Sequence, residues 1–214
     1  MKSEIIINYL DELFPEPKCE LIYFNDYSLL IAIVLSAQCT DKRVNMVTPI
    51  IFNKYKTLED LSKADINDLE EIIRPVGSFR KKSIYIKEIA NIILNNYEGK
   101  VPTNKKLLEE LPGVGRKTAN VFLSEFYNYP AIAVDTHVER VSKRLKLAYN
   151  NDSVNKVEEK LMNKFPKDKW ARLHLQLVLF GRYYCKAVRP ECKTCKLKEI
   201  CRYKGKDIWK ELYL

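Results

Sequence analysis

The sequence predicts an all-α protein. Apolar residues recur at the three- and four-residue spacing of amphipathic helices along most of the 214-residue chain. Helix-starting residues and short breaks with proline or glycine separate these segments, and no segment shows the alternation typical of a half-buried strand. With 46% hydrophobic residues, the chain can form one large domain or two small ones with a substantial core.

The charge balance indicates a polyanionic partner. Thirty-seven basic and 28 acidic side chains give a formal charge of +9, which favours nucleic acid or an acidic membrane surface. The longest apolar run, Leu29–Leu35, is too short to span a bilayer, and the acidic Glu4 and Asp11 stand where a signal peptide needs an apolar core. We therefore expect a soluble protein in the cytoplasm, associated with the nucleoid if the protein is bacterial. The charge alone does not choose between the two partners, and no pattern signals an oligomeric state; we expect a monomer with no membrane partner.

Three helices are expected in the first quarter of the chain. Residues 4–14 form a short amphipathic helix that stops before Pro15. Ser28 then caps the run Leu29–Leu35, which is apolar on every side and therefore predicts a buried central helix. A polar break that contains Gln38 precedes the third helix. An amide in such a break is ordinarily just solvated.

Two short helices and one long helix follow. Thr57 and Asp65 have side chains that begin helices, and residues 74–77, with the sequence Arg-Pro-Val-Gly, close the second short helix. Residues 83–97 continue as a long helix whose isoleucines face inward.

A basic segment with one aromatic residue, 78–82, lies before the long helix. An aromatic ring among cations suits base stacking beside phosphate contacts, so Phe79 and Arg80 are candidate nucleic-acid contacts. A lone phenylalanine at a helix start is more often a packing residue. Both interpretations of Phe79 stay open at the level of sequence.

A helical hairpin is predicted for residues 104–127. Leucines at the start of this segment form one apolar stripe, and the helix after the Pro-Gly-Val-Gly turn forms a second. The glycines let the backbone adopt a positive φ and approach a ligand closely, and the following helix begins with free N–H groups. Such a helix start is suited to phosphate. The candidate phosphate contacts are Gly113, Val114, Gly115 and Arg116.

Lys117 lies in the first turn of the second hairpin helix, which is an unusual place for a cation. The positive end of the helix dipole opposes the charged ammonium. Helical spacing puts Lys117 on the same side as Ser124 and either Asn120 or Val121, a more polar stripe than the opposite side, so we expect the amine to face a cleft. An arbitrary lysine is usually a solvated surface residue. The neighbouring glycines favour the more specific interpretation.

Asp135 stands at the start of the next predicted helix. Either Asp135 or Thr136 is a good N-cap, and Thr136 with Glu139 has the pattern of a capping box. A purely structural role is therefore enough to explain these residues. Two long helices, 153–165 and 168–184, complete the helical part of the chain.

Four cysteines crowd the C-terminal region with the spacing C-x6-C-x2-C-x5-C. They are Cys185, Cys192, Cys195 and Cys201. In an intracellular protein, thiolates this close together can surround one metal centre. Zinc usually takes two C-x2-C knuckles and only one is present, so the spacing favours a four-iron cluster over zinc. The stretch 182–210 also has an excess of cations, including Lys186 and Arg189, which suits phosphate contacts.

Three of these features occur together in one known family. The segment 111–119 with its glycine turn and lysine, the sequence Val-Asp-Thr-His at 134–137, and the cysteine spacing resemble the endonuclease III family of DNA glycosylases, which carry a helix-hairpin-helix motif. The resemblance extends from about Leu29 to Cys201. The combination is highly specific, whereas a helix-hairpin-helix alone would be weak support.

The resemblance implies a fold and a reaction. The fold is a six-helix barrel domain at residues 20–130 that contains the hairpin, and an iron–sulfur cluster domain made from residues 1–19 and 131–214. In this family DNA lies across the cleft between the two domains, with an oxidised pyrimidine flipped out of the duplex. The implied reaction is removal of that base, then β-elimination at the abasic site through a lysine Schiff base. The implied cofactor is a [4Fe-4S] cluster.

The same resemblance assigns roles to single residues. Lys117 falls on the catalytic lysine of the family, Asp135 on its catalytic aspartate, and Gln38 on the residue that fills the gap left by the flipped base. A nearby carboxylate favours a charged lysine, so Asp135 is expected to stabilise positive charge on the sugar or to relay protons. The family commonly has a leucine wedge where this chain has Ser78. Either Phe79 takes that task or the wedge is weaker.

Three other interpretations have clear discriminators. An adenine glycosylase of the same fold resembles this chain without a lysine at position 117. A non-catalytic DNA-binding module would leave Lys117 and Asp135 with no reason to act together. A zinc-bound transcriptional regulator would be excluded by iron and sulfide in the protein. The sequence therefore predicts a bifunctional DNA glycosylase with abasic-site lyase activity that binds double-stranded DNA.

Overall fold

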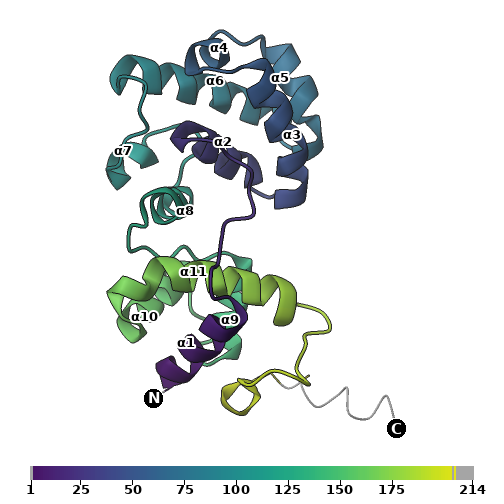
Figure 1. Ribbon diagram of the computed structural model, residues 1–214, viewed down its shortest axis with the longest axis vertical. Helices are drawn as coiled ribbons and strands as arrows, with labels where there is room; N and C mark the ends of the chain where they lie inside the picture. The colour runs from purple at the N-terminus through teal and green to yellow at the C-terminus, as the bar shows by residue number, and fades with distance from the viewer. Residues whose placement is uncertain (1, 204, 206–214) are drawn as a thin grey trace. The chain divides into compact units, whose positions relative to one another are not determined.

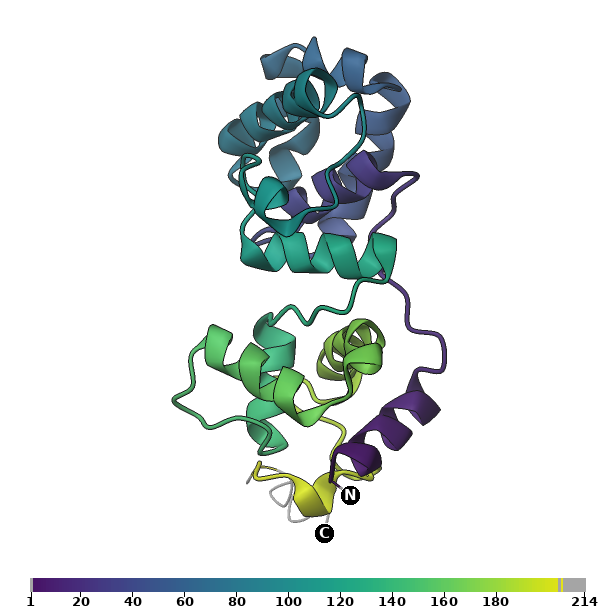
Figure 2. The ribbon, with the colours of Figure 1, turned by 90° about the vertical axis from the view of Figure 1, so that its left-hand side faces the viewer.

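The computed structural model describes residues 2–203 and 205, and every regular element within these residues is helical (Figure 1, Figure 2). The all-α class expected from the sequence is therefore confirmed. The chain divides into a central unit, Glu20–Tyr127, and a terminal unit, Met1–Cys19 with Asn128–Leu214. Among the described helices, none combines the length and the apolar character that crossing a bilayer requires.

The central unit is packed around α2. Its helices are α2 (Asp26–Ser36), α3 (Asp41–Lys54), α4 (Leu58–Ser62), α5 (Ile66–Ile73), the 3₁₀ helix η1 (Arg74–Val76), α6 (Phe79–Asn96), α7 (Lys105–Glu109) and α8 (Arg116–Tyr127). Helix α2 contacts α3, α6 and α8. Residues 28–35 of α2 are all buried, as the continuous apolar run predicts.

Helix starts in the central unit follow local rules. Thr57 and Asp60 form the capping box of α4, and Asp65 caps α5. The cap of α2 differs from the expectation, because Asn25 is the N-cap and Ser28 is the third helical residue. The Asn25 side chain accepts the Ser28 N–H at 3.0 Å, and Ser28 Oγ accepts the Asn25 N–H at 2.9 Å. This reciprocal pair satisfies two N–H groups, which a cap at Ser28 alone would not do.

The terminal unit contains both ends of the chain. Its elements are α1 (Lys2–Leu13), α9 (Thr136–Arg144), α10 (Val154–Lys164), η2 (Lys167–Lys169), α11 (Trp170–Leu179), the π-helical turn η3 (Phe180–Tyr184) and η4 (Lys198–Ile200). Helix α1 packs against α11, where the Asp11 carboxylate accepts hydrogen bonds from Arg172 and Gln176, both at 2.8 Å. The single helix expected over 168–184 is therefore divided into three pieces.

One hydrophobic core joins the parts of the terminal unit. Its buried side chains include Ile6, Leu10, Val138, Val141, Leu161, Leu177 and Phe180. The core also contains the fully buried Leu197, and Cys185, Cys195 and Cys201 pack against it. The cysteine-rich segment and helix α9 are thus built on the same core.

Candidate functional site

The hairpin predicted at 104–127 is present, with α7 and α8 on either side of the turn. The Val114 side chain is buried beneath the turn. Gly113, Gly115 and Arg116 are exposed. The turn therefore presents its glycines and one cation to solvent, while the valine anchors it to the core.

The two glycines of the turn differ in backbone conformation and in the space around them. Gly113 has φ +75°, and a Cβ there would lie 2.6 Å from the Tyr85 ring and 3.3 Å from Val34. Gly115 has no positive φ, and a Cβ there would meet nothing within 4 Å. Of the two glycines, Gly113 therefore uses the backbone freedom expected of this turn. The absence of a Cβ at Gly115 leaves open space beside the start of α8.

Lys117 lies in the first turn of α8 and is exposed. Asn120 and Ser124, which helical spacing puts on the same side, are only 3% and 6% exposed. Tertiary packing therefore covers the later positions of the expected polar stripe. Along this side of α8, Asn120 and Ser124 are buried, and the Lys117 amine at the N-terminal end, beside the hairpin turn, is exposed.

Two further loops of the central unit have unusual backbone geometry. Gln38 follows α2 with φ +56°, and Ser78 precedes α6 with φ +47°. Both residues are exposed. The Phe79 ring is half-buried, and the guanidinium groups of Arg74 and Arg80 each lie 5.4 Å from its centroid. The ring thus lies near two cations, with part of its surface accessible.

These two loops and the hairpin turn meet at one end of the central unit. Val34, in the last turn of α2, and Tyr85, in the second turn of α6, both contact Gly113. The C-terminal end of α2, the N-terminal end of α6 and the hairpin are therefore neighbours. The structure brings together Gln38, Phe79 and the start of α8, which are far apart in the sequence.

Asp135 is the N-cap of α9 in the terminal unit. Its Oδ1 accepts hydrogen bonds from the N–H groups of His137 at 2.9 Å and Val138 at 2.8 Å. Asp135, and not Thr136, is thus the cap. Within the described part of the chain, Oδ2 accepts no hydrogen bond, and the side chain is half-buried. The helix start therefore orients the carboxylate and leaves one oxygen available.

Two arginines connect α9 to the segment that carries the first cysteine. Arg140 donates from Nε to the Cys185 carbonyl at 3.1 Å and from Nη2 to the Gly181 carbonyl at 2.6 Å. Arg144 donates from Nη1 to the Lys186 carbonyl at 2.7 Å and to Cys185 Sγ at 3.3 Å. Residues four apart lie on one side of a helix. The two arginines therefore fix one face of α9 to the start of the cysteine-rich segment.

The four cysteines predicted to bind metal line one cavity. The other lining residues are Leu145, Phe180, Tyr184, Pro190, Glu191, Lys198 and Tyr203. Burial raises the pKa of the Cys185 thiol and raises that of Cys195 to about 11. The Tyr203 N–H donates to Cys201 Sγ at 3.4 Å. Donors at two sulfurs and a shared cavity suit metal-bound thiolates, since a bound cation favours the thiolate that burial opposes.

The cluster itself stays a prediction. Within the described ranges, no three His, Cys, Asp or Glu side chains are grouped so as to hold a metal ion. Of the cations expected near the cysteines, Lys186 forms an ion pair with Glu191 at 2.9 Å, and Arg189 is exposed with φ +50°. Part of the basic stretch, 204 and 206–210, lies outside the residues that the structure describes.

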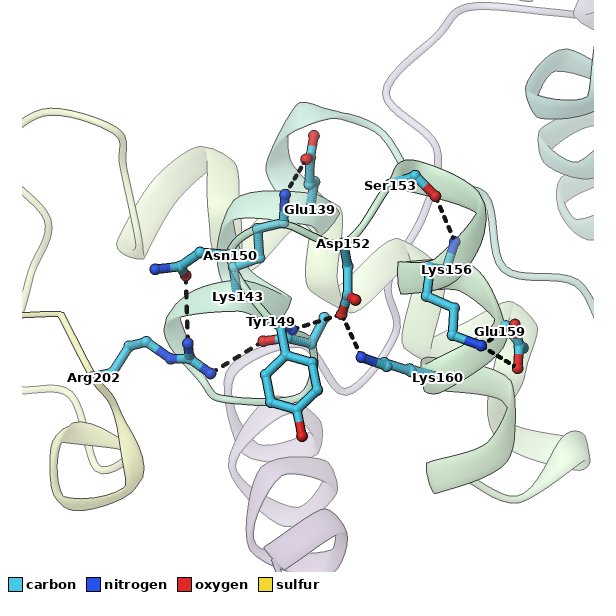
Figure 3. Close-up of polar contacts among 11 residues, drawn as sticks. Glu139, Lys143, Tyr149, Asn150, Asp152, Ser153, Lys156, Glu159, Lys160 and Arg202 are labelled. Atoms are coloured by element: carbon cyan, nitrogen blue, oxygen red, sulfur yellow. Dashed lines mark hydrogen bonds and ion pairs between the residues drawn. The ribbon is translucent and has the colours of Figure 1, made fainter.

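The far end of the cysteine-rich segment is fixed to the connection between α9 and α10. Arg202 donates to the Ala148 carbonyl at 3.1 Å and to Asn150 Oδ1 at 3.4 Å (Figure 3). Its own N–H donates to the Arg144 carbonyl at 2.8 Å. The Asp152 carboxylate in turn closes the connection through hydrogen bonds shown in Figure 3. Both ends of the segment are thus attached to α9 or to the loop that follows it.

Comparison with known proteins gives the family. Residues 31–167 match the model of the HhH-GPD superfamily base excision DNA repair proteins. Endonuclease III of Bacillus subtilis strain 168 is 46% identical over 199 residues, which cover 93% of this chain and 91% of that protein. The chain belongs to the endonuclease III family. Endonuclease III of Escherichia coli K12 is 38% identical over 201 residues, 94% of this chain and 95% of that protein.

Solved structures related to the endonuclease III family share the fold. A trapped endonuclease III–DNA covalent intermediate, an estranged-adenine complex, matches this chain with a TM-score of 0.90 at 45% identity, covering 98% of this chain and 99% of that one. A thermostable thymine-DNA glycosylase matches with a TM-score of 0.85 at 26% identity, covering 96% and 97%. The family that the sequence motifs predict is therefore confirmed.

Proposed function

We propose that Lys117 is the nucleophile of this base excision repair enzyme, a DNA glycosylase that also cleaves the abasic site, and that its substrates are oxidised pyrimidines in double-stranded DNA. The observation that carries the proposal is the position of Lys117. The amine is exposed in the first turn of α8, directly after a turn in which Gly115 leaves open space. A phosphate bound at the free N–H groups of this helix start places a deoxyribose next to the amine.

The chemistry follows from a neutral amine at this position. The Lys117 nitrogen attacks C1′ of the sugar, and the base leaves with the electrons of the glycosidic bond. The amine then loses its proton, and the C1′–O4′ bond opens as O4′ takes up a proton, which leaves a Schiff base between C1′ and the lysine nitrogen. The Schiff base makes the C2′ hydrogens acidic, so loss of one of them expels the 3′ phosphate and cuts the strand. Only a neutral amine can make this attack, because an ammonium has no free electron pair.

Asp135 acts on the sugar in this proposal, and not on the lysine. Two N–H groups hold Oδ1, which leaves Oδ2 to face positive charge on the sugar or to accept a proton. A carboxylate directly beside the amine would stabilise the ammonium, which is the opposite of what a nucleophile needs. The two residues thus act on the same nucleotide in different ways.

The proposed DNA contacts come from the loops at the end of α2 and the start of α6, and from the cysteine-rich segment. Gln38 fills the gap left by the flipped base, Phe79 takes the place of the usual leucine wedge, and Arg80 contacts phosphate. Lys186 and Arg189 add further phosphate contacts. Each such contact releases counterions, so binding should weaken steeply as salt rises. A flat salt dependence would contradict this assignment.

We also propose that the four cysteines hold a [4Fe-4S] cluster. Support comes from the cavity that they share and from the donors at Cys185 and Cys201 sulfurs. When bound, the cluster would cross-link the segment that carries the four thiolates, and no electron transfer is assigned to it. On this proposal residues 20–130 are the barrel domain, 1–19 with 131–214 are the cluster domain, and the protein works as a monomer on DNA in the cytoplasm.

Borohydride trapping tests the proposed nucleophile, because borohydride reduces a Schiff base to a permanent bond. The substrate is a duplex with thymine glycol or an abasic site. The wild-type protein should form a covalent complex, and Lys117→Ala should form none while still binding the duplex. Asp135→Asn keeps the capping oxygen, so it should fold normally but react about 100-fold more slowly. Wild-type levels of trapping in Lys117→Ala would refute the assignment.

A further inference from the structure

Lys82, near the start of α6, is a buried cation without a carboxylate partner. The residue is 5% exposed, and no Asp or Glu of the described chain forms a hydrogen bond or ion pair with it. Burial lowers the pKa of Lys82, against a smaller opposite effect of the Cys39 thiol. An unpaired ammonium in the interior costs several kcal/mol unless polar groups replace its water. Its surroundings must therefore supply those groups.

Backbone carbonyls supply all of them. Lys82 Nζ donates to the carbonyls of Leu35 at 2.9 Å, Ala37 at 2.9 Å and Val76 at 3.1 Å. A lysine ammonium has three N–H donors, so each one is used. Two of the carbonyls lie at the C-terminal end of α2, where carbonyls lack partners within the helix and the helix dipole is negative. The third comes from the last residue of η1.

Two of the three bonded carbonyls lie directly before turns with a left-handed backbone. Ala37 precedes Gln38, which has φ +56°. Val76 precedes Gly77 and Ser78, which have φ +67° and +47°. A residue with a Cβ in the left-handed region costs about 1–2 kcal/mol, and such geometry persists only where the surrounding structure holds it. Both turns are therefore held at the same point by a single side chain.

We propose that Lys82 is a positioning residue that couples the Gln38 turn to the Ser78–Phe79 turn, and so sets how the two enter the DNA stack together. The inference rests on the proposed function of these turns as the gap-filling and wedging elements. Because one ammonium bonds the backbone before both turns, neither can move alone without leaving a buried or partly buried carbonyl unpaired. Extrusion of a paired base needs both turns at once, and so depends on this coupling.

The test compares two lysines of the same helix. Lys82→Met keeps an unbranched apolar chain and removes all three donors. Lys87→Met is the matched control, since Lys87 is half-buried on α6 and donates to only one carbonyl, that of Ala64 at 2.9 Å. Single-turnover excision of thymine glycol is measured in a fully paired duplex and in an unpaired bulge, below the unfolding temperature of every variant. The readout is the ratio of the two rates.

Lys82→Met should lower the duplex rate by about 10- to 100-fold and the bulge rate much less, because a bulged base needs little help to leave the stack. Lys87→Met should keep the wild-type ratio. A wild-type ratio in Lys82→Met would overturn the inference, since a merely structural loss lowers both rates together. If Lys82→Met does not fold, Lys82→Gln replaces it, since its amide keeps two donors. The ratio of the two rates should then shift in the same direction by a smaller factor. An unchanged ratio in Lys82→Gln would also overturn the inference.

Failure of the proposed function would look different. In that case the wild-type protein itself would neither excise thymine glycol nor be trapped by borohydride, and the role of Lys82 in DNA would fall with it. Normal excision and trapping by the wild type, with an unchanged ratio in Lys82→Met, would leave the proposed function intact and remove only the coupling by Lys82.

Discussion

The two units of this protein hold their functional loops in different ways. In the central unit, the turns at Gln38 and Ser78 are fixed by hydrogen bonds of their neighbouring backbone to one buried ammonium. In the terminal unit, the segment from Cys185 to Cys201 contains one short 3₁₀ helix, and arginine side chains attach its ends. The central unit thus completes its loops with protein groups alone. The terminal unit leaves four thiols around a cavity, which a bound cluster would satisfy.

The largest effect on one unit alone is expected from Cys195→Ser, which removes one of the four thiols. Loss of a structural metal site typically costs more than about 4 kcal/mol. The absorbance of the proposed cluster should disappear, and amides of α9 and α11 should lose protection from hydrogen exchange. Amides of α2 and α6 should keep their protection, because their unit does not depend on the cluster.

Cys39→Ser is the matched control for this experiment. Cys39 is also half-buried, lies in the central unit and does not line the cavity. The variant should keep both the cluster and the protection pattern of the wild type. Equal loss of protection in the two units of Cys195→Ser would contradict the comparison.

Alanine substitution of one glycine in each unit should have smaller effects, which differ in kind between the two units. A Cβ at Gly181 would lie 2.8 Å from the Cβ of His137 and 3.2 Å from its backbone. Gly181→Ala should therefore lower the free energy of unfolding, measured by urea denaturation, by about 1–3 kcal/mol, because the added methyl group overpacks the site. A Cβ at Gly115 would meet nothing within 4 Å. Gly115→Ala should cost less than about 1 kcal/mol, yet weaken binding to an abasic-site duplex.

Fluorescence anisotropy measures that binding. The added methyl group at Gly115 stands where the phosphate is proposed to approach, so the dissociation constant should rise roughly tenfold, equivalent to about 1.4 kcal/mol. Gly181→Ala, measured where it is folded, should bind more nearly like the wild type. Unchanged binding by Gly115→Ala would show that DNA does not approach the hairpin at this point.

The smallest predicted effect concerns alkaline pH and the central unit alone. The Tyr55 hydroxyl donates to the Asp68 carboxylate. Burial, together with that carboxylate, raises the pKa of Tyr55 from 10.0 to about 12. Since the folded-state pKa lies above the unfolded one, this contribution is complete below pH 10 and is lost as the pH rises through about 12.

Tyr55→Phe removes the titrating group and is therefore the reference. Urea denaturation at a series of pH values gives the free energy of unfolding of both proteins. Between pH 10 and 12 it should fall by about 1 kcal/mol or less more in the wild type than in the variant, because the pair is partly exposed and water screens it. Identical pH dependence in the two proteins would mean that the hydrogen bond to Asp68 is not coupled to folding.

Helix positions and caps are largely predictable from the sequence because they depend on a few adjacent residues. Thr57, Asp65 and Ser153 cap helices in the structure where the sequence expects helix starts. The start of α2 shows the limit of this approach. Both Asn25 and Ser28 can cap a helix, and which of them does so depends on how far the helix extends at its N-terminal end.

Lys82 shows what local patterns leave out. The sequence places it in a basic segment, 78–82, that suits phosphate contacts, whereas the structure buries it. A signal is present, since Lys82 lies four residues before Ile86 and seven before Ile89 and therefore shares their inward side of α6. Its partners cannot be predicted in the same way, because the carbonyl of Leu35 comes from a distant part of the chain.

In the terminal unit, too, local spacing predicts part of the site and tertiary contacts decide the rest. The spacing of the four cysteines predicts one shared site, and all four line a single cavity. Arg140 and Arg144 carry no motif, since two cations four residues apart are typical of any solvated helix face. Their contacts with Cys185 depend on tertiary packing that brings this segment beside α9.

The claim that Lys117 carries the chemistry can be tested on one peptide. Trypsin cleaves after lysine and arginine, and neither occurs between Lys117 and Arg140. Reduction of the Schiff base by borohydride blocks cleavage after Lys117. Mass spectrometry of the trapped wild-type protein should therefore find the peptide 117–140 with a DNA remnant, in place of the unmodified peptide 118–140. A remnant on any other lysine, or on the N-terminal amine, would contradict the account.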